Sequence, residues 1–197
     1  MIPYEFSAER FSRWMSYVLR HNPERYGLQP DRHGFVNLGE FLQVAARRYP
    51  DLGPDRIRTL IEAGGSSRFE VAGDRLRARY GHFIRVEPVG PPAEPPPFLY
   101  FGTEAEASSA ILAEGLKPAD RSSLHLSTTL DEARTIASRK TASVAVFRVL
   151  AQEASKAGVA FFREGELFLT AHVPAQFLVR ETLPEPIGGV SAPRPAV

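Results

Sequence analysis

The chain contains no cysteine, which excludes disulfide bridges, thiolate metal sites and cysteine nucleophiles. It also has no apolar run of membrane-spanning length, and MIPYEFSAER at its start carries charge where a signal peptide has its apolar core. We therefore expect a cytoplasmic protein without a membrane partner. Lysine is scarce, since 21 of the 24 basic residues are arginines. Acidic residues balance them to a net charge of +1, so the overall charge does not indicate nucleic acid as a partner. The preference for arginine over lysine fits phosphate binding or a GC-rich genome equally well.

Proline is concentrated in one segment. The stretch PVGPPAEPPP, residues 88–97, holds six prolines in ten positions and favours stiff extended chain over a packed element. Folded segments on both sides make a linker over 88–96 a better interpretation than a proline-rich ligand for a partner. We predict lobes over residues 1–87 and 97–182, followed by a loose tail over 183–197.

The first half reads as three helices and a β-hairpin. Helical spacing of apolar residues predicts a helix over residues 8–20, because Pro23 cannot continue it. Asn37 and Glu40 have capping-box spacing and open a second helix. A third begins at Pro54 and ends at Gly64-Gly65. A β-hairpin is predicted after it, with the strand RFEVA, a turn at Gly73-Asp74 and the strand RLRARY. This order is typical of a winged helix.

The second half alternates strands with short helices. FLYF, LHLS, VAVFRV, ELFLT and FLVR are apolar and β-prone. A helix is expected from Glu104 to Glu114, stopped by Gly115, and another from the capping pair Thr129 and Glu132 to about Arg139. The whole chain is therefore predicted to be α+β.

Arginine and histidine stand together at two places that suit anion chemistry. Arg20-His21 puts a fixed cation beside a titratable imidazole at a helix end, which suits phosphate binding and proton transfer. Basic residues at a helix C-terminus also stabilise the helix dipole, so a purely structural role stays open. RLRARY alternates strictly, so its three arginines share one strand face. That face predicts either phosphate binding or an edge strand guarded by charge.

Two further motifs are weaker by themselves. Gly102-Thr103 lies between a strand and a helix, where an anion site or an ordinary turn is possible. His125 and Ser127 share one face of a strand, which fits a ligand contact or a half-buried histidine bonded to backbone. No pair of histidines or carboxylates has metal-ligand spacing, so no metal is expected, and Glu164 with Glu166 is not a convincing acid–base pair.

Taken together, these segments resemble a known family. LRHNPERYGLQPDRHGFVNLGEFL resembles the start of the KptA-like RNA 2′-phosphotransferases (tRNA 2′-phosphotransferases), enzymes of tRNA splicing that use NAD to remove a splice-junction 2′-phosphate. LRARYGH, YFGT, and HLS with a downstream arginine resemble later motifs of that family, in the same order. The resemblance spans roughly residues 11–180 and implies a winged-helix, RNA-binding lobe followed by an ADP-ribosyltransferase-like, NAD-binding lobe.

The resemblance also implies roles for single residues. The family's four catalytic positions are Arg20, His21, Arg77 and Arg139 in this chain. Its NAD contacts fall on His82, Phe101, Gly102, Thr103, His125 and Ser127. The chain departs from the family at four places. Phe101 replaces a histidine that contacts the ribose, and Phe83 replaces a serine. Lys140-Thr141 replaces the usual His-Gly, and Phe168 lies near the position of a usual tryptophan.

The implied reaction joins the RNA 2′-phosphate to the ribose of NAD and releases nicotinamide. The ADP-ribosylated RNA intermediate then gives RNA with a free 2′-OH and ADP-ribose 1″,2″-cyclic phosphate. Such an enzyme takes a tRNA-like RNA with a 2′-phosphate and NAD as partners, needs no metal, and is expected to be a monomer. Two alternatives stay open: an ADP-ribosyltransferase that caps terminal phosphates of RNA or DNA, and a non-catalytic RNA-binding module.

Overall fold

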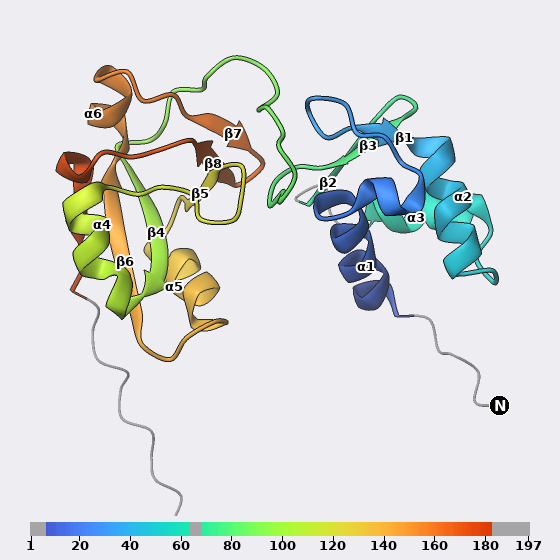
Figure 1. Ribbon diagram of the computed structural model, residues 1–197, viewed down its shortest axis with the longest axis horizontal. Coiled ribbons are helices and arrows are strands. Elements are labelled where there is room, and N and C mark those ends of the chain that lie inside the picture. The colour runs from blue at the N-terminus through green and yellow to red at the C-terminus, as the bar shows by residue number, and fades with distance from the viewer. Residues whose placement is uncertain (1–6, 64–67, 183–197) are drawn as a thin grey trace, which may run out of the picture.

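The computed structural model describes residues 7–63 and 68–182, and its mixture of helices and sheets confirms the α+β class. We call the part up to β3 the first lobe and the part from β4 the second lobe (Figure 1). The first lobe consists of α1 (Ala8–Arg20), η1 (Pro23–Tyr26), β1 (Val36–Asn37), α2 (Leu38–Arg48), α3 (Pro54–Ala63), β2 (Phe69–Ala72) and β3 (Arg75–Ala78).

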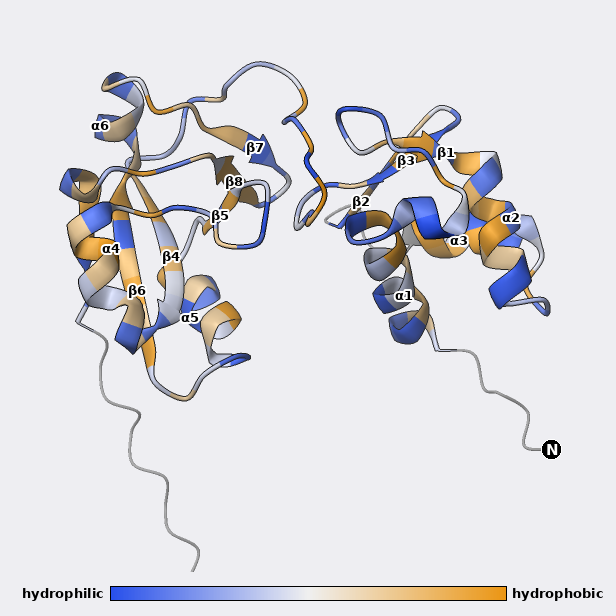
Figure 2. Cartoon of the chain, viewed as in Figure 1, coloured by the Kyte–Doolittle hydropathy of each residue, from blue (hydrophilic) through white to orange (hydrophobic). Residues whose placement is uncertain are grey.

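Helix α1 has the bounds that the sequence predicts. The Ser7 side chain caps it by accepting a hydrogen bond from the Arg10 N–H, and the helix ends just before His21. Its buried residues recur at helical spacing and pack with α2 and the sheet in the first hydrophobic core. In Figure 2 hydrophobic and hydrophilic residues accordingly occupy different faces of α1 and α2. Asn37 caps α2 through the Glu40 N–H, as its capping-box spacing predicts.

The arginine-bearing strand β3 is not an edge strand. The first sheet has the order β1-β3-β2, so β3 is central and pairs antiparallel with both neighbours. The explanation of its arginines as the charges that protect an edge strand is therefore wrong, because β3 pairs with β2 along its length and with β1 at Arg75 and Leu76. The predicted end of α3 at Gly64-Gly65 lies outside the described residues.

The second lobe is built on a six-stranded antiparallel sheet in the order β7-β8-β5-β4-β6-β9. Its elements are β4 (Phe98–Glu104), η2 (Ala105–Ala107), α4 (Ser108–Glu114), β5 (Leu124–Ser127), α5 (Leu130–Ser138), β6 (Val144–Leu150), α6 (Ala151–Lys156), β7 (Phe162–Glu164), β8 (Leu167–Thr170), η3 (Ala175–Phe177) and β9 (Leu178–Arg180). The helix predicted from Glu104 to Glu114 ends at Glu114 before Gly115 as expected, but its predicted start was wrong. Glu104 still pairs with Val144 in the sheet, and this long-range pairing extends β4 by one residue before the helical turns begin.

Helix α5 lies against one face of the central sheet, while α4 and α6 lie on the opposite side (Figure 1). A Cβ atom at Gly102 would collide with the Ala133 carbonyl oxygen of α5. A glycine in β4 is therefore required for this helix to approach the sheet, whatever ligand the strand also meets. Thr129 caps α5 by accepting from the Glu132 N–H, as predicted.

The chain between β3 and β4 has neither helix nor strand and crosses between the lobes. It is bonded to both: the Glu87 N–H donates to the Arg32 carbonyl of the first lobe, and the Ala93 N–H donates to the Phe161 carbonyl of the second. Within the described residues, no helix combines the length and the apolar character that crossing a bilayer requires.

Candidate active site between the lobes

The segment that follows β3 brings side chains of the two lobes together. The Gly81 N–H donates to His125 Nε2 at 3.2 Å, and the Ser122 N–H donates to the His82 carbonyl at 3.2 Å. Gly81 has a φ of 85°, and a Cβ there would lie 3.1 Å from an Arg20 nitrogen. A glycine is needed at this position, because it lets the crossing segment pass directly over the Arg20 guanidinium.

Arg20 is a largely buried cation that no carboxylate of residues 7–63 and 68–182 pairs with. Within the same residues its buried Nε and Nη2 atoms make no hydrogen bond, and its Cζ lies 5.2 Å from the Tyr80 ring centroid. Burial is the main cause that lowers the pKa of Arg20, with a smaller contribution from Arg121 in the same direction. Because a buried guanidinium is costly unless it is paired, this arrangement points to an anion as the missing partner.

His21 lies in a stack of three rings beside Arg20. Its centroid is 5.5 Å from that of Tyr17 and 4.0 Å from that of Phe83, and the rings are nearly parallel. Burial, followed by the charges of Arg20 and Arg121, lowers the pKa of His21. The imidazole is therefore neutral at pH 7, and the stack fixes its orientation while one nitrogen can accept a hydrogen bond or a proton.

His125 faces two donors at once. Gly81 N–H points to its Nε2, and Nη1 of Arg121 lies 2.7 Å from its Nδ1. Burial, followed by Arg121 and Arg20, lowers the pKa of His125 to about 3. A neutral imidazole accepts at only one nitrogen, so one of the two donors is left available to another acceptor. We call Arg20, His21, Arg121 and His125, whose positive charge comes from the two arginines, the cation cluster.

His82, expected to contact NAD, is directed into the protein. Only 3% of the residue is exposed, and its Nε2 lies 2.8 Å from the Ala78 carbonyl oxygen, to which it donates. Burial is the main reason that the pKa of His82 falls to about 4, and the charges of Arg20 and Arg77 add to it. Nδ1 of His82 has no hydrogen-bond partner among the described residues.

Arg77 belongs to a second, electrically balanced group. Its Nε donates to Glu70 Oε2 at 2.8 Å, and its Nη2 lies 2.9 and 3.0 Å from the two carboxylate oxygens of Glu164. Arg79 lies 3.4 Å from Glu70 and 3.7 Å from Glu164. We call Glu70, Arg77, Arg79 and Glu164 the ion-pair cluster. The arginine face of β3 thus meets carboxylates, one from its own sheet and one from the second lobe.

The remaining predicted residues lie on the second lobe. Arg139 is the exposed C-cap of α5, and no contact among the described residues joins it to Arg20, His21 or Arg77. His125 and Ser127 alternate with the core residues Leu124 and Leu126 and so point to the opposite face of the sheet.

The strand end at residues 101–103 divides its side chains between the two faces. Phe101 packs against the second hydrophobic core, whereas the position of Gly102 faces α5. Thr103 is half-buried and follows Gly102, so it shares the face of Phe101. The aromatic ring at residue 101 therefore lies on the core side of the sheet rather than on the side of His125.

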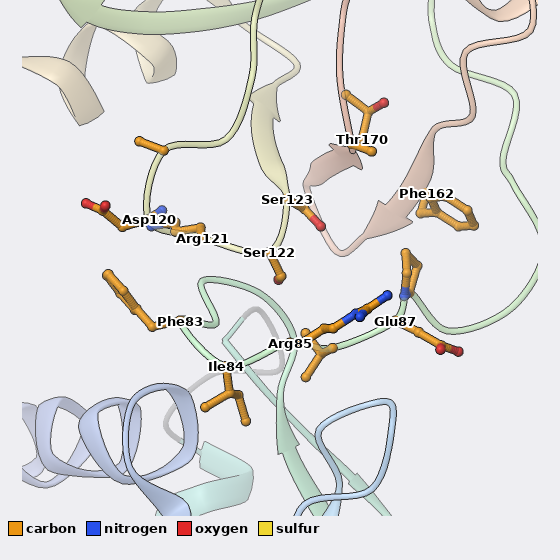
Figure 3. Close-up of a pocket in the computed structure, with 14 residues that line it drawn as sticks. Phe83, Ile84, Arg85, Glu87, Asp120, Arg121, Ser122, Ser123, Phe162 and Thr170 are labelled. Atoms are coloured by element: carbon orange, nitrogen blue, oxygen red, sulfur yellow. The ribbon is translucent and has the colours of Figure 1, made fainter.

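A cavity of about 480 Å³ opens beside the cation cluster. Figure 3 shows Phe83, Ile84 and Arg85 of the crossing segment on one side and Asp120, Arg121, Ser122 and Ser123 on the other. Phe162 and Thr170 of the second lobe and Glu87 of the crossing segment also line it. Aromatic rings, guanidinium groups, hydroxyl groups and the carboxylates of Asp120 and Glu87 therefore surround a space that adjoins Arg121 of the cation cluster.

Sequence reasoning missed two participants, Arg121 and Glu164. Arg121 contacts His125 from a loop whose sequence, ADRSS, has no motif that indicates a site. Glu164 was considered only as half of an acid–base pair with Glu166, yet it binds Arg77, which is 87 residues away in the chain. Arg121 is only four residues before His125, but it lies in a loop whose side-chain directions follow no regular period, and Glu164 is distant in the chain, so the fold was needed to find both contacts.

Comparison with known proteins gives a consistent family assignment. A model of the family described as "RNA 2'-phosphotransferase, Tpt1 / KptA family" matches residues 7–172. A probable RNA 2′-phosphotransferase 1 of Archaeoglobus fulgidus is 34% identical over 182 residues, which cover 92% of this chain and 84% of the relative.

Two other relatives carry the same description. A probable RNA 2′-phosphotransferase of Thermococcus kodakarensis is 37% identical, covering 80% of this chain and 88% of its own. One of Streptomyces coelicolor is 36% identical, covering 86% and 93%. With four motifs in order, a cation cluster between two lobes and matches over most of its length, the chain belongs to the RNA 2′-phosphotransferase family.

Proposed function

We propose that this protein removes an internal 2′-phosphate from RNA of the tRNA splice-junction type, with NAD as the co-substrate. The observation that carries the proposal is Arg20, a largely buried guanidinium whose Nε and Nη2 find no partner in the part of the chain that the structure describes. A phosphate supplies the charge and the acceptor oxygens that this group lacks. The membership of the chain in the RNA 2′-phosphotransferase family supports RNA as the carrier of that phosphate.

In this proposal the protein acts by clamping and orienting charge. Arg20 and Arg139 bind the phosphate oxygens, and Arg77 joins them once it is released from its carboxylate partners. His21, held neutral and fixed in its ring stack, orients the phosphate and receives or returns a proton at its free nitrogen. Groups of this kind stabilise developing charge without a protein nucleophile.

NAD supplies the ribose carbon to which the phosphate is transferred, with nicotinamide as the leaving group. The residues present fit a nucleotide sugar and its phosphates: His125 and Ser127 share one sheet face, and Arg121 adds a donor at the cavity. Phe101, which lies on the core side of the strand, does not fit a hydrogen bond to ribose, so we assign the ribose contacts to His125 and Ser127.

The same proposal extends to the parts of the chain. The first lobe, with three helices and a small sheet, acts as a winged helix that binds RNA, and the second acts as an ADP-ribosyltransferase-like lobe that binds NAD. Residues 88–96 connect them as a linker, and the protein works as a cytoplasmic monomer without a metal. Because Arg20 and His21 come from one lobe and Arg139 from the other, neither lobe alone is expected to be active.

Incubation with NAD and an RNA oligonucleotide carrying one internal 2′-phosphate tests the function, in a metal-free buffer containing EDTA. The proposal predicts RNA with a 2′-OH, free nicotinamide and ADP-ribose 1″,2″-cyclic phosphate in equal amounts. A stable RNA–ADP-ribose adduct would instead indicate an enzyme that caps phosphates. Binding of the RNA without release of nicotinamide would indicate a non-catalytic module, and either result contradicts the proposal.

A further inference from the structure

Glu164 occupies the edge of Arg77 that a phosphate would need. Both of its carboxylate oxygens lie within 3.0 Å of Arg77 Nη2, and Glu70 takes Nε of the same guanidinium. Two acceptors on one planar fork match the geometry with which arginine binds phosphate. Within the described residues, then, carboxylates already occupy both Nε and Nη2 of Arg77.

The contact is buried and spans the two lobes. The side chains of Arg77 and Glu164 are only 4% and 3% exposed, and they come from β3 and β7. The space around them is almost filled, because the cavity lined by Arg77, Arg79, His82, His125 and Glu164 holds only about 10 Å³. That volume suits at most one water molecule, so a phosphate cannot reach Arg77 unless a present group moves.

Charge balance explains why Glu164 is the group that moves. The ion-pair cluster has two cations and two carboxylates, so adding a phosphate would leave excess negative charge in a buried place. Glu70 is held on the neighbouring strand, where it is the register partner of Arg77. Glu164 ends β7 at the turn into β8, and separation of the lobes withdraws it from Arg77 without breaking the first sheet.

We propose that Glu164 is an internal substitute for the substrate phosphate, which holds Arg77 in a resting ion pair until the RNA 2′-phosphate takes its place. This inference rests on the proposed function, because it assumes that the phosphate binds between the lobes. The resting ion pair between Glu164 and Arg77 then has two effects: it couples the lobes, and it lowers the affinity of the protein for the RNA phosphate. Burial raises the pKa of Glu164, and the charges of Arg77 and Arg79 oppose this effect, so the two arginines favour the ionised carboxylate in its buried position.

The test is Glu164→Gln, with Glu166→Gln as the matched control. The glutamine amide introduced by the first variant still offers an oxygen to Arg77 but no charge. The control makes the same change in net charge at an exposed position two residues further on. Binding of an RNA oligonucleotide with one 2′-phosphate, and of the same RNA with a 2′-OH, is measured by calorimetry without NAD. We expect Glu164→Gln to increase the affinity ratio between the two RNAs by about tenfold and Glu166→Gln to leave it unchanged.

The possible results distinguish the role of Glu164 from the proposed enzymatic function. If wild type prefers the phosphorylated RNA and Glu164→Gln prefers it equally or less, the substitution model is overturned and the proposed function stands. An equal gain in Glu166→Gln also overturns it, because the effect is then only net charge. If no variant distinguishes the two RNAs, the proposed substrate itself is wrong. Should Glu164→Gln not fold by circular dichroism, Glu164→Asp, which draws the carboxylate back, is expected to give a smaller gain in the same direction.

Discussion

Arg20 and Arg77 lie between the lobes in different surroundings, although both match catalytic positions in the motifs of the family. Among the described residues Arg20 in the cation cluster has buried nitrogens without partners, whereas Arg77 in the ion-pair cluster has carboxylates on its Nε and its Nη2. The charge of Arg20 is therefore not offset by any described carboxylate, whereas that of Arg77 is neutralised by internal acids. The comparison teaches that a matched catalytic residue gives the chemical group, while its neighbours decide whether that group is free to act.

Removal of Arg20 is expected to have the largest effect on activity. Arg20→Ala should lower the rate of RNA dephosphorylation by at least about tenfold, because a charge-assisted contact contributes roughly 1.5–3 kcal/mol. The measurement is the initial rate of nicotinamide release at saturating NAD. Arg13→Ala is the control, because Arg13 is an exposed residue of the same helix, paired with Glu9. Equal losses in the two variants would mean that Arg20 is not special.

Arg77 and Arg139 should separate stability from activity. Both alanine variants should lose activity, but only Arg77→Ala should lose stability, by about 3 kcal/mol, because it removes the closer of the two cations beside the buried Glu164 carboxylate. Arg139→Ala, at an exposed cap, should change the free energy of unfolding by less than about 0.5 kcal/mol. Urea unfolding of both proteins checks this. A stable Arg77→Ala protein would show that the ion-pair cluster contributes little to joining the lobes.

Acid should weaken the contact between the lobes through His82 and His125. Their pKa values are about 4 and about 3 in the folded protein and near 6.5 when unfolded, so the unfolded chain binds more protons in the interval between. Stability should therefore fall as pH drops from about 6.5 toward 4, by up to about 2 kcal/mol per histidine at pH 5. His125→Asn should flatten the curve of unfolding free energy against pH. Arg121 and Arg20 face His125, and their positive charges act in the same direction, joined by His82 only once it is itself protonated near pH 4.

Phe101 should give the smallest effect. Its ring packs on the core side of β4, so Phe101→His is expected to reduce stability by about 1 kcal/mol and to leave the Michaelis constant for NAD within about twofold. Steady-state kinetics with NAD varied at saturating RNA measures this. A tenfold fall in that constant would show that residue 101 contacts the ribose and that the strand end presents this side chain to the ligand.

Local signals account for most of what the sequence predicted. Capping at Asn37 and Thr129 depends on residues three positions apart, and both caps are present as expected. The error at Glu104 arose because sheet pairing with Val144, forty residues away, overrides the local preference for helix.

The site shows the same division more sharply. Arg20-His21 lies at a helix end that local rules identify, and the family resemblance supplied the other positions. The partners of those residues were not predictable: Glu164 reaches Arg77 across the lobes, and Arg121 reaches His125 from a loop. Which groups compensate the charge of a residue depends on the side chains around it in the folded protein, so these partners could be identified only from the structure.

The most direct test of the account is the affinity of the protein for RNA with and without a single 2′-phosphate, in wild type and in Arg20→Gln. The account predicts that wild type binds the phosphorylated RNA at least about tenfold more tightly and that Arg20→Gln loses this preference while it retains the affinity for the 2′-OH form. Measurement at constant salt is essential, because non-specific RNA binding depends strongly on ionic strength. An undiminished preference for the phosphate in Arg20→Gln would contradict the central claim that the unpaired guanidinium of Arg20 is where the phosphate binds.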